Sequence, residues 1–213
     1  MKEELQIEDG IKQNRDSRSL WDYLAFGIST IFSPYITAAI FILLITYSYS
    51  KNLQQFLPWM GIAFLFAIII PGVYVLWLIE KRDIHDIHLS IHSQRKVPFI
   101  VAGISATLGA IALAAIGAAK PVVVMGVVYA VNAVTVGLLT LFWKVSIHTA
   151  LYSSVVTVII ILFGIQYAWL YLILIPLCWS RIHRHRHNLN QVIGGAMISF
   201  VLTSLVFWLF GYI

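Results

Sequence analysis

The chain has 213 residues, of which 60% are apolar and only 11% are charged, and its formal net charge is +5. A soluble globular domain carries about half apolar and about a quarter charged residues, so this composition excludes one and requires lipid as the solvent for much of the chain. The basic residues stand in short loops between apolar runs. That distribution favours lipid headgroups or a phosphorylated substrate over nucleic acid as the partner.

Residues 1–19 are polar and of mixed charge, without the apolar core of a signal peptide, and are interpreted as a cytoplasmic tail. Residues 20–213 then form a single transmembrane domain. Its runs free of Asp, Glu, Lys and Arg are residues 23–50, 52–79, 97–119, 121–143, 145–180 and 188–213.

Each run reaches the roughly 20 residues that cross hydrocarbon. We expect Pro34 to break the first run, and a division at 164–166 to split run 145–180 into two short spans. The sequence therefore predicts an all-α, polytopic transmembrane helix bundle with seven spans, or six if the first run is peripheral.

Three polar segments, residues 80–96, 143–148 and 180–191, are separated from one another by two crossings each, which places them on the same membrane face. They contain all seven histidines of the chain: His85, His88, His92, His148, His183, His185 and His187. Such clustering indicates a functional site on one face.

The same segments carry cations that approach helix starts. Free N–H groups and the dipole make a helix N-terminus attractive to anions, and guanidinium groups bind phosphate oxygens in pairs. Spacing of four residues further predicts that Lys144 and His148 share a helix face, as do His187 and Gln191. A simpler alternative for the loop cations is contact with lipid headgroups. The pattern favours a phosphate site.

The third segment resembles the third signature, SR-x5-H-x3-D, of the type 2 phosphatidic acid phosphatase superfamily. It reads Ser180-Arg181, five residues, His187, three residues and Gln191. Residues 145–148, Val-Ser-Ile-His, resemble the second signature, PSGH. The first signature, K-x6-RP, is matched only in a degenerate form, with His88 in the lysine position and residues 95–96, Arg-Lys, in place of Arg-Pro.

The resemblance implies a metal-independent membrane phosphatase, without a cofactor, acting on a lipid or prenyl phosphate or diphosphate. His187 would be the nucleophile, His148 the proton donor, and Gln191 the residue that orients His187. The remaining residues implied for the phosphate are Arg95, Arg181, Lys144 and Ser146, together with His88, Lys96 and Ser180. Two departures stand out, since the family has an acid where this chain has Gln191 and a lysine where it has His88.

Two other readings stay open. His88 and His92 form an HxxxH pair that suits a membrane di-iron hydroxylase or desaturase. The neutral Gln191 and the degenerate first signature suit a catalytically inactive, lipid-binding protein on the phosphatase fold. Between phosphatidic-acid-like and prenyl substrates, the lack of a large soluble headgroup-binding insert favours prenyl substrates.

Charge also predicts sidedness. Of the 14 Lys and Arg residues, all except Lys51 and Lys120 lie in the tail or in the three polar segments. The positive-inside rule then places the site on the cytoplasmic face of an integral, multi-pass membrane protein.

Overall fold

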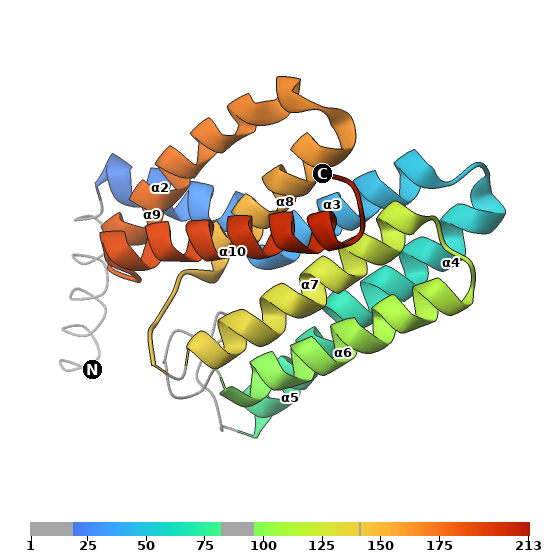
Figure 1. The fold of residues 1–213 in the computed structure, drawn as a ribbon. Coiled ribbons are helices and arrows are strands. Elements are labelled where there is room, and N and C mark those ends of the chain that lie inside the picture. The colour runs from blue at the N-terminus through green and yellow to red at the C-terminus, as the bar shows by residue number, and fades with distance from the viewer. Residues whose placement is uncertain (1–18, 82–95, 141) are drawn as a thin grey trace.

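The computed structural model describes residues 19–81, 96–140 and 142–213. These residues form a bundle of helices and contain no strand (Figure 1). In chain order the helices are α2 (Leu20–Ile31), α3 (Pro34–Tyr49), α4 (Leu53–Phe64), the π-helix η1 (Leu65–Ile69), α5 (Ile70–Glu80), α6 (Lys96–Ala115), α7 (Lys120–Leu139), α8 (Ile147–Phe163), the 3-10 helix η3 (Ile165–Ile173), α9 (Leu174–His183) and α10 (Leu189–Leu209).

The membrane-spanning segments follow the apolar runs. Within the described residues, five helical segments are long and apolar enough to cross: Leu53–Glu80, Val97–Ala115, Lys120–Leu139, Ile165–His183 and Leu189–Leu209. The pair α2 and α3, bent by 41°, makes a sixth if it counts as one span. Helix α8, with 17 residues, reaches the lower limit of crossing lengths. The chain is therefore an integral membrane protein, and the predicted all-α polytopic bundle is confirmed.

The two predicted helix breaks lie at Pro34, which lacks an N–H, and at Gly164, which has a positive φ. Pro34 is the first residue of α3, and the Ser33 hydroxyl before it accepts a hydrogen bond from the Ile36 N–H at 3.4 Å. A proline is tolerated there because the first N–H of a helix has no partner within the helix. Gly164 ends α8 with a φ of 112°, which is open to glycine without strain.

The π-helix η1 is explained by Pro71, which has no N–H to donate to the preceding turn. Two neighbouring helices satisfy carbonyls in that turn: the Tyr129 hydroxyl donates to the Ala67 carbonyl at 3.0 Å, and the Ser105 hydroxyl donates to the Phe66 carbonyl at 2.6 Å. In hydrocarbon an unsatisfied carbonyl would cost several kcal/mol, so these bonds fix η1 against α6 and α7.

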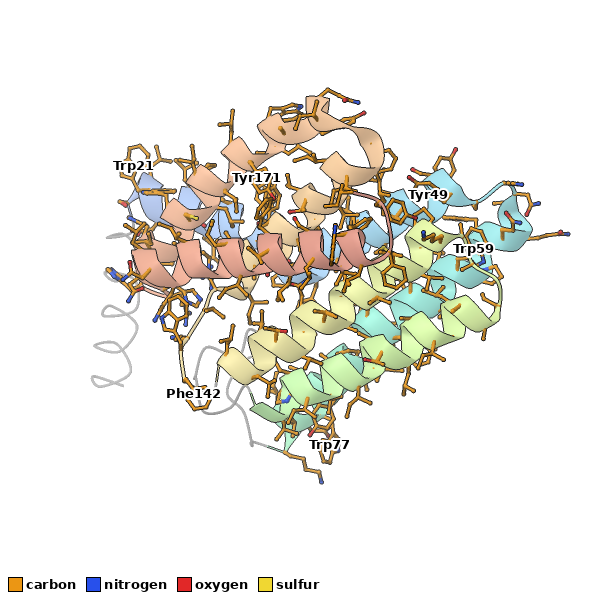
Figure 2. The ribbon with its side chains drawn as sticks, viewed as in Figure 1. Trp21, Tyr49, Trp59, Trp77, Phe142 and Tyr171 are labelled. Atoms are coloured by element: carbon orange, nitrogen blue, oxygen red, sulfur yellow. The ribbon has the colours of Figure 1, made fainter. Side chains whose placement is uncertain are left out.

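Aromatic side chains mark both ends of the bundle. Figure 2 places Trp21, Trp77 and Phe142 toward one end and Tyr49 and Trp59 toward the other. Trp21 and Trp77 are largely exposed. Trp and Tyr concentrate at the two membrane–water interfaces, so this distribution agrees with a bundle that spans a bilayer.

The described parts of the three polar segments lie at one end of the bundle. In Figure 1 the start of α2, the end of α9, the start of α10 and the connection from α7 to α8 lie at the left, with the end of α5 and the start of α6. The α3–α4 connection and the α6–α7 turn, which carry Lys51 and Lys120, lie at the opposite end. The fold therefore gathers the described candidate residues at one end of the bundle.

Candidate functional site

The start of α10 is built by a reciprocal cap. The Asn188 side-chain oxygen accepts a hydrogen bond from the Gln191 N–H at 3.0 Å, and the Gln191 side-chain oxygen accepts one from the Asn188 N–H at 3.2 Å. This capping box satisfies two N–H groups that a helix start leaves open. It also fixes which end of the Gln191 amide is oxygen, because only an acceptor can face the Asn188 N–H.

His187 lies directly before this cap and is 8% exposed. Its Nδ1 atom is 3.2 Å from the Gln191 side-chain oxygen and 3.2 Å from the Lys144 carbonyl oxygen. Both neighbours are acceptors, so Nδ1 must carry the hydrogen and donate it. In the neutral ring, Nε2 then holds the lone pair. The structure thus brings Gln191 and His187 together and sets the tautomer that a nucleophilic Nε2 needs.

The connection from α7 to α8 is held against the first turn of α10. The Ser146 N–H donates to the Gln191 carbonyl at 3.1 Å, and the Thr149 hydroxyl donates to the Val192 carbonyl at 2.9 Å. Gly195 permits this approach, since a Cβ there would lie only 2.7 Å from the Ser146 carbonyl oxygen. The starts of α8 and α10 are therefore adjacent.

Lys144 differs from its predicted placement. Helix α8 begins at Ile147, with Ser146 as an extended N-cap, so Lys144 precedes the helix and the prediction that it shares a helix face with His148 is wrong. The physical reason is that the Ser146 N–H bonds to α10, which holds this stretch out of the helix. Lys144 contributes its carbonyl oxygen to His187, a contact that side-chain patterns do not reveal.

His148 and Ser146 occupy the start of α8. His148 lies in the first turn and is 5% exposed, and Ser146 is fully buried. Within the described part of the chain the Ser146 hydroxyl has no hydrogen-bond partner. A buried hydroxyl without a partner costs about 1–3 kcal/mol, which a bound oxygen ligand would offset.

Arg181 comes from the last turn of α9 and is 7% exposed. Its guanidinium donates a hydrogen bond through Nη1 to the hydroxyl of Ser29 in α2, and its carbonyl accepts the N–H groups of Arg186 and His187 at 3.1 and 3.4 Å. His185, with a φ of 51°, turns the chain back toward that carbonyl. Arg181 and His187, six residues apart, are thereby adjoined.

Ser180 is fully buried, and its hydroxyl donates to the Leu177 carbonyl in its own helix at 2.8 Å. Because a hydroxyl has a single hydrogen, Ser180 directs none toward a phosphate in this structure. Its predicted phosphate contact therefore requires a different rotamer.

A second set of contacts ties α9 to α2. His183 Nε2 lies 2.8 Å from an Asp22 carboxylate oxygen, and the His183 ring stacks on Trp179. The Arg184 guanidinium lies over the Phe26 ring, 5.0 Å from its centre. Burial and, to a smaller extent, the charge of the neighbouring Arg186 lower the pKa of the Arg184 guanidinium. A bound anion would reduce the repulsion between Arg184 and Arg186.

The start of α6 reaches the same place. Pro98 and Phe99 in its first turn line a cavity together with Ile147 and His148. The start of α6 is therefore adjacent to the start of α8, which is itself adjacent to the start of α10. The helix begins at Lys96, while Arg95 and His88, both predicted phosphate ligands, lie outside the described residues.

Metal-binding side chains do not gather in the part of the chain that the structure describes. There, no three His, Cys, Asp or Glu side chains lie close enough to hold one ion. His88 and His92, the pair on which the iron alternative depends, lie outside that part.

Besides the Lys144 carbonyl contact, two further site features were missed by the sequence interpretation. The contact of Ser29 with Arg181 joins residues 152 positions apart, and no local pattern marks it. The capping boxes do have a local signature, a polar residue followed three positions later by an acid or amide, seen at Ser19–Asp22 and Asn188–Gln191.

No family model, no curated protein and no solved structure matches this chain. Function must therefore be argued from the site itself.

Proposed function

We propose that this chain is a metal-independent membrane phosphatase that removes phosphate from a lipid or prenyl phosphate or diphosphate through a phosphohistidine intermediate. The observation that carries the proposal is that His187 Nδ1 lies within hydrogen-bond distance of two acceptors, the Gln191 side-chain oxygen and the Lys144 carbonyl. Nδ1 therefore carries the hydrogen, and Nε2 of the neutral ring has the lone pair. A histidine held in this way beside buried Arg181 and Ser146 is equipped as a nucleophile toward an anion.

In the first step, His187 Nε2 attacks phosphorus and forms a P–N bond while the bond from phosphorus to the leaving oxygen breaks. His148 donates a proton to that oxygen. The equatorial oxygens gain charge, and the guanidinium of Arg181, the Ser146 hydroxyl and the N–H groups at the starts of α8 and α10 stabilise it. Arg95, His88, Lys96 and the Lys144 ammonium are the further cations proposed for this role.

In the second step, His148 takes a proton from water, the water oxygen attacks phosphorus, and the P–N bond breaks. Inorganic phosphate leaves and His187 is restored. Gln191 and the Lys144 carbonyl hold Nδ1–H throughout, so the ring keeps its orientation while it carries positive charge. The cations supply the charge stabilisation for both steps, so no metal ion takes part in the scheme.

The substrate is proposed to be amphiphilic because the site stands at the end of an apolar bundle, where a headgroup meets hydrocarbon. The excess of Lys and Arg at this end supports a cytoplasmic position for the site.

One observation favours a second candidate, a lipid-phosphate-binding protein without turnover. Gln191 is neutral, so it orients His187 without stabilising the positive ring by charge. Such a protein would bind the same ligands and release no phosphate.

The test is phosphate release from prenyl and lipid phosphates by purified protein in nanodiscs that contain a chelator. Wild type and a His183→Ala control, whose histidine contacts Asp22 instead, are expected to turn over. His187→Ala and His148→Ala are expected to be inactive while eluting as folded protein. Turnover by His187→Ala would reject the nucleophile. Binding without turnover by wild type would establish the second candidate.

A further inference from the structure

Three adjoining cavities run from the candidate site into the bundle. The first, of about 110 Å³, has His148 and Ile147 at its wall. The second, of about 50 Å³, shares Ala38, Ala67 and Tyr129 with it. A third, of about 80 Å³, shares Tyr129 and Ile147 with the first.

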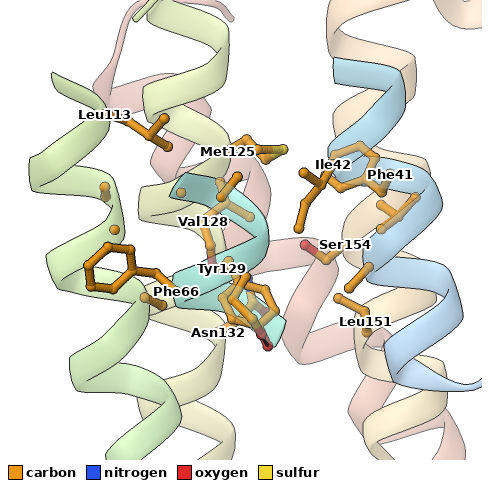
Figure 3. Close-up of a pocket in the computed structure, with 18 residues that line it drawn as sticks. Phe41, Ile42, Phe66, Leu113, Met125, Val128, Tyr129, Asn132, Leu151 and Ser154 are labelled. Atoms are coloured by element: carbon orange, nitrogen blue, oxygen red, sulfur yellow. Dashed lines mark hydrogen bonds between the residues drawn. The ribbon is translucent and has the colours of Figure 1, made fainter. Parts of the chain in front are cut away.

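The series is deep. Along α6 the lining residues begin at Pro98 in the first cavity and end at Leu113 in the second. Fifteen helical steps correspond to about 22 Å, which is most of the roughly 30 Å of bilayer hydrocarbon. Figure 3 shows the inner chamber, with Leu113 and Met125 toward one end and Tyr129 and Asn132 toward the other.

Small residues leave the volume of these cavities open. Ala102, Ala106, Gly109 and Ala110 line it from α6, and Ala38 lines it from α3. Larger side chains at these positions would close it, since protein interiors are otherwise filled to crystal-like density.

The walls are mostly apolar, although the Asn132 side-chain oxygen and the Ser199 hydroxyl, which line the second and third cavities, have no hydrogen-bond partner within the described residues. The Tyr129 hydroxyl, which lies where the cavities adjoin, already donates to the Ala67 carbonyl. The Ser154 hydroxyl in the inner chamber is bonded to that of Thr203 at 2.8 Å. Because apolar side chains make up most of the lining, hydrocarbon is the group that this space suits best.

We propose that these cavities hold the single hydrocarbon chain of the substrate, which enters beside His148 and extends toward Leu113. This inference rests on the proposed function and narrows its substrate to single-chain lipid phosphates of the prenyl type. His148 supports it, because the proposed proton donor to the leaving oxygen lines the first cavity, so the carbons next to that oxygen would lie at the cavity wall. The chambers are small, about 50 to 110 Å³ each, which favours one hydrocarbon chain over two acyl chains side by side.

The first test compares chain lengths. Wild type, Ala106→Leu and the control Ala115→Leu are assayed with geranyl and geranylgeranyl phosphate, and the ratio of the two kcat/KM values is measured. Ala106 is 4% exposed and lines the inner chamber, whereas Ala115 is exposed on the same helix. Ala106→Leu is expected to lower the ratio for the longer chain by about tenfold or more, and Ala115→Leu is expected to keep the wild-type ratio.

An unchanged ratio in Ala106→Leu would overturn the inference, as would equal wild-type efficiency with geranylgeranyl phosphate and dioleoyl phosphatidic acid. Failure of every substrate to release phosphate would instead defeat the proposed function.

The second test needs no turnover and no cavity variant. A geranylgeranyl phosphate with a photoreactive group at its far end is bound to His187→Ala and irradiated, and the labelled peptides are mapped. Labels are expected at interior residues such as Leu113 and Met125, both buried. Labels confined to outward-facing residues such as Ile104 and Ile111 would place the chain in the surrounding lipid and overturn the inference.

Discussion

The Nδ1 atom of His187 lies 3.2 Å from the side-chain oxygen of Gln191, and that same oxygen accepts the Asn188 N–H. One amide thus caps α10 and selects the tautomer of the buried histidine. The arrangement separates two properties that a carboxylate would combine, because the amide orients the ring but adds no negative charge. Substitutions of Gln191 can therefore measure how the missing negative charge affects the proposed reaction.

Gln191→Glu is expected to raise the turnover rate about fivefold. Glutamate has the same length and keeps the cap, and it is favoured near a helix N-terminus. A charge-assisted hydrogen bond is worth about 1 kcal/mol more than a neutral one, and this gain appears when His187 becomes positive on attacking phosphorus. Steady-state kcat for a prenyl phosphate measures the change.

Gln191→Leu is the matched counterpart, of similar size but without the acceptor. It is expected to lower both kcat and thermal stability, since the Asn188 N–H loses its partner. Equal kcat in the Glu and Leu variants would show that position 191 has no electrostatic influence on the reaction.

The substitutions of His187 and His148 are expected to block different steps of the proposed reaction. With an aryl phosphate, whose leaving group departs without a proton, His148→Ala is expected to form the phosphohistidine and then stall, because no base activates water. His187→Ala is expected to form none. Acid-labile, alkali-stable phosphate on the protein after rapid quenching distinguishes them.

With alkyl phosphates, His148→Ala is expected to lose roughly a hundredfold or more in kcat, the usual contribution of a general acid. A phosphorylated His187→Ala protein would assign the nucleophile to another residue.

Gly195→Ala is expected to disturb the site without touching a functional side chain. The added Cβ would lie 2.7 Å from the Ser146 carbonyl oxygen and 3.0 Å from the Thr149 hydroxyl, so α10 must move away from α8. Overpacking of this kind costs about 1–3 kcal/mol. Thermal unfolding in detergent and kcat should both fall.

Gly61→Ala is the control, because a Cβ at Gly61, also inside a helix, meets nothing within 4 Å. It is expected to keep wild-type activity and to change stability by less than about 1 kcal/mol. A Gly195→Ala protein as stable and active as this control would contradict the close packing of the two helix starts.

Much of the fold could be predicted because lipid imposes strong constraints. Charge-free runs located the spans, and Pro34 and Gly164 mark the helix ends where a missing N–H or a positive φ requires them. The pairing of His187 with Gln191 was accessible too, since four residues bridge one helical turn.

The remaining features depend on contacts between distant segments. The Lys144 carbonyl reaches His187 only because α8 starts three residues later than Lys144, which is set by a bond from Ser146 to α10. Likewise the pairing of Ser29 with Arg181 follows from the packing of α2 on α9. Neither position carries a local signal, so periodicity and propensity could not reveal them.

Ser29→Ala tests that packing. Ser29 is 2% exposed and accepts a hydrogen bond from the Arg181 guanidinium, and bonds to charged groups contribute about 1.5–3 kcal/mol. The variant is expected to unfold at a lower temperature and to show a raised KM, because Arg181 loses a contact that orients it. Ser48→Ala, an exposed serine bonded within its own helix, is the control and is expected to stay within about 0.5 kcal/mol of wild type. Equal effects of the two substitutions would remove Ser29 from the support of the site.

Sidedness can be read from two lysines at opposite ends of the bundle. Lys81 ends α5 at the site end, and Lys51 lies in the α3–α4 connection at the other end; both are exposed. In a Cys178→Ser background, Lys81→Cys is expected to react with a membrane-impermeant maleimide only after the cells are opened, and Lys51→Cys is expected to react on intact cells. The positive-inside rule requires this result because the tail and the site carry nearly all the cations, whereas the opposite loops carry two. The reverse labelling would place the proposed phosphate site on the outer face, and its cations would then be explained by substrate binding alone.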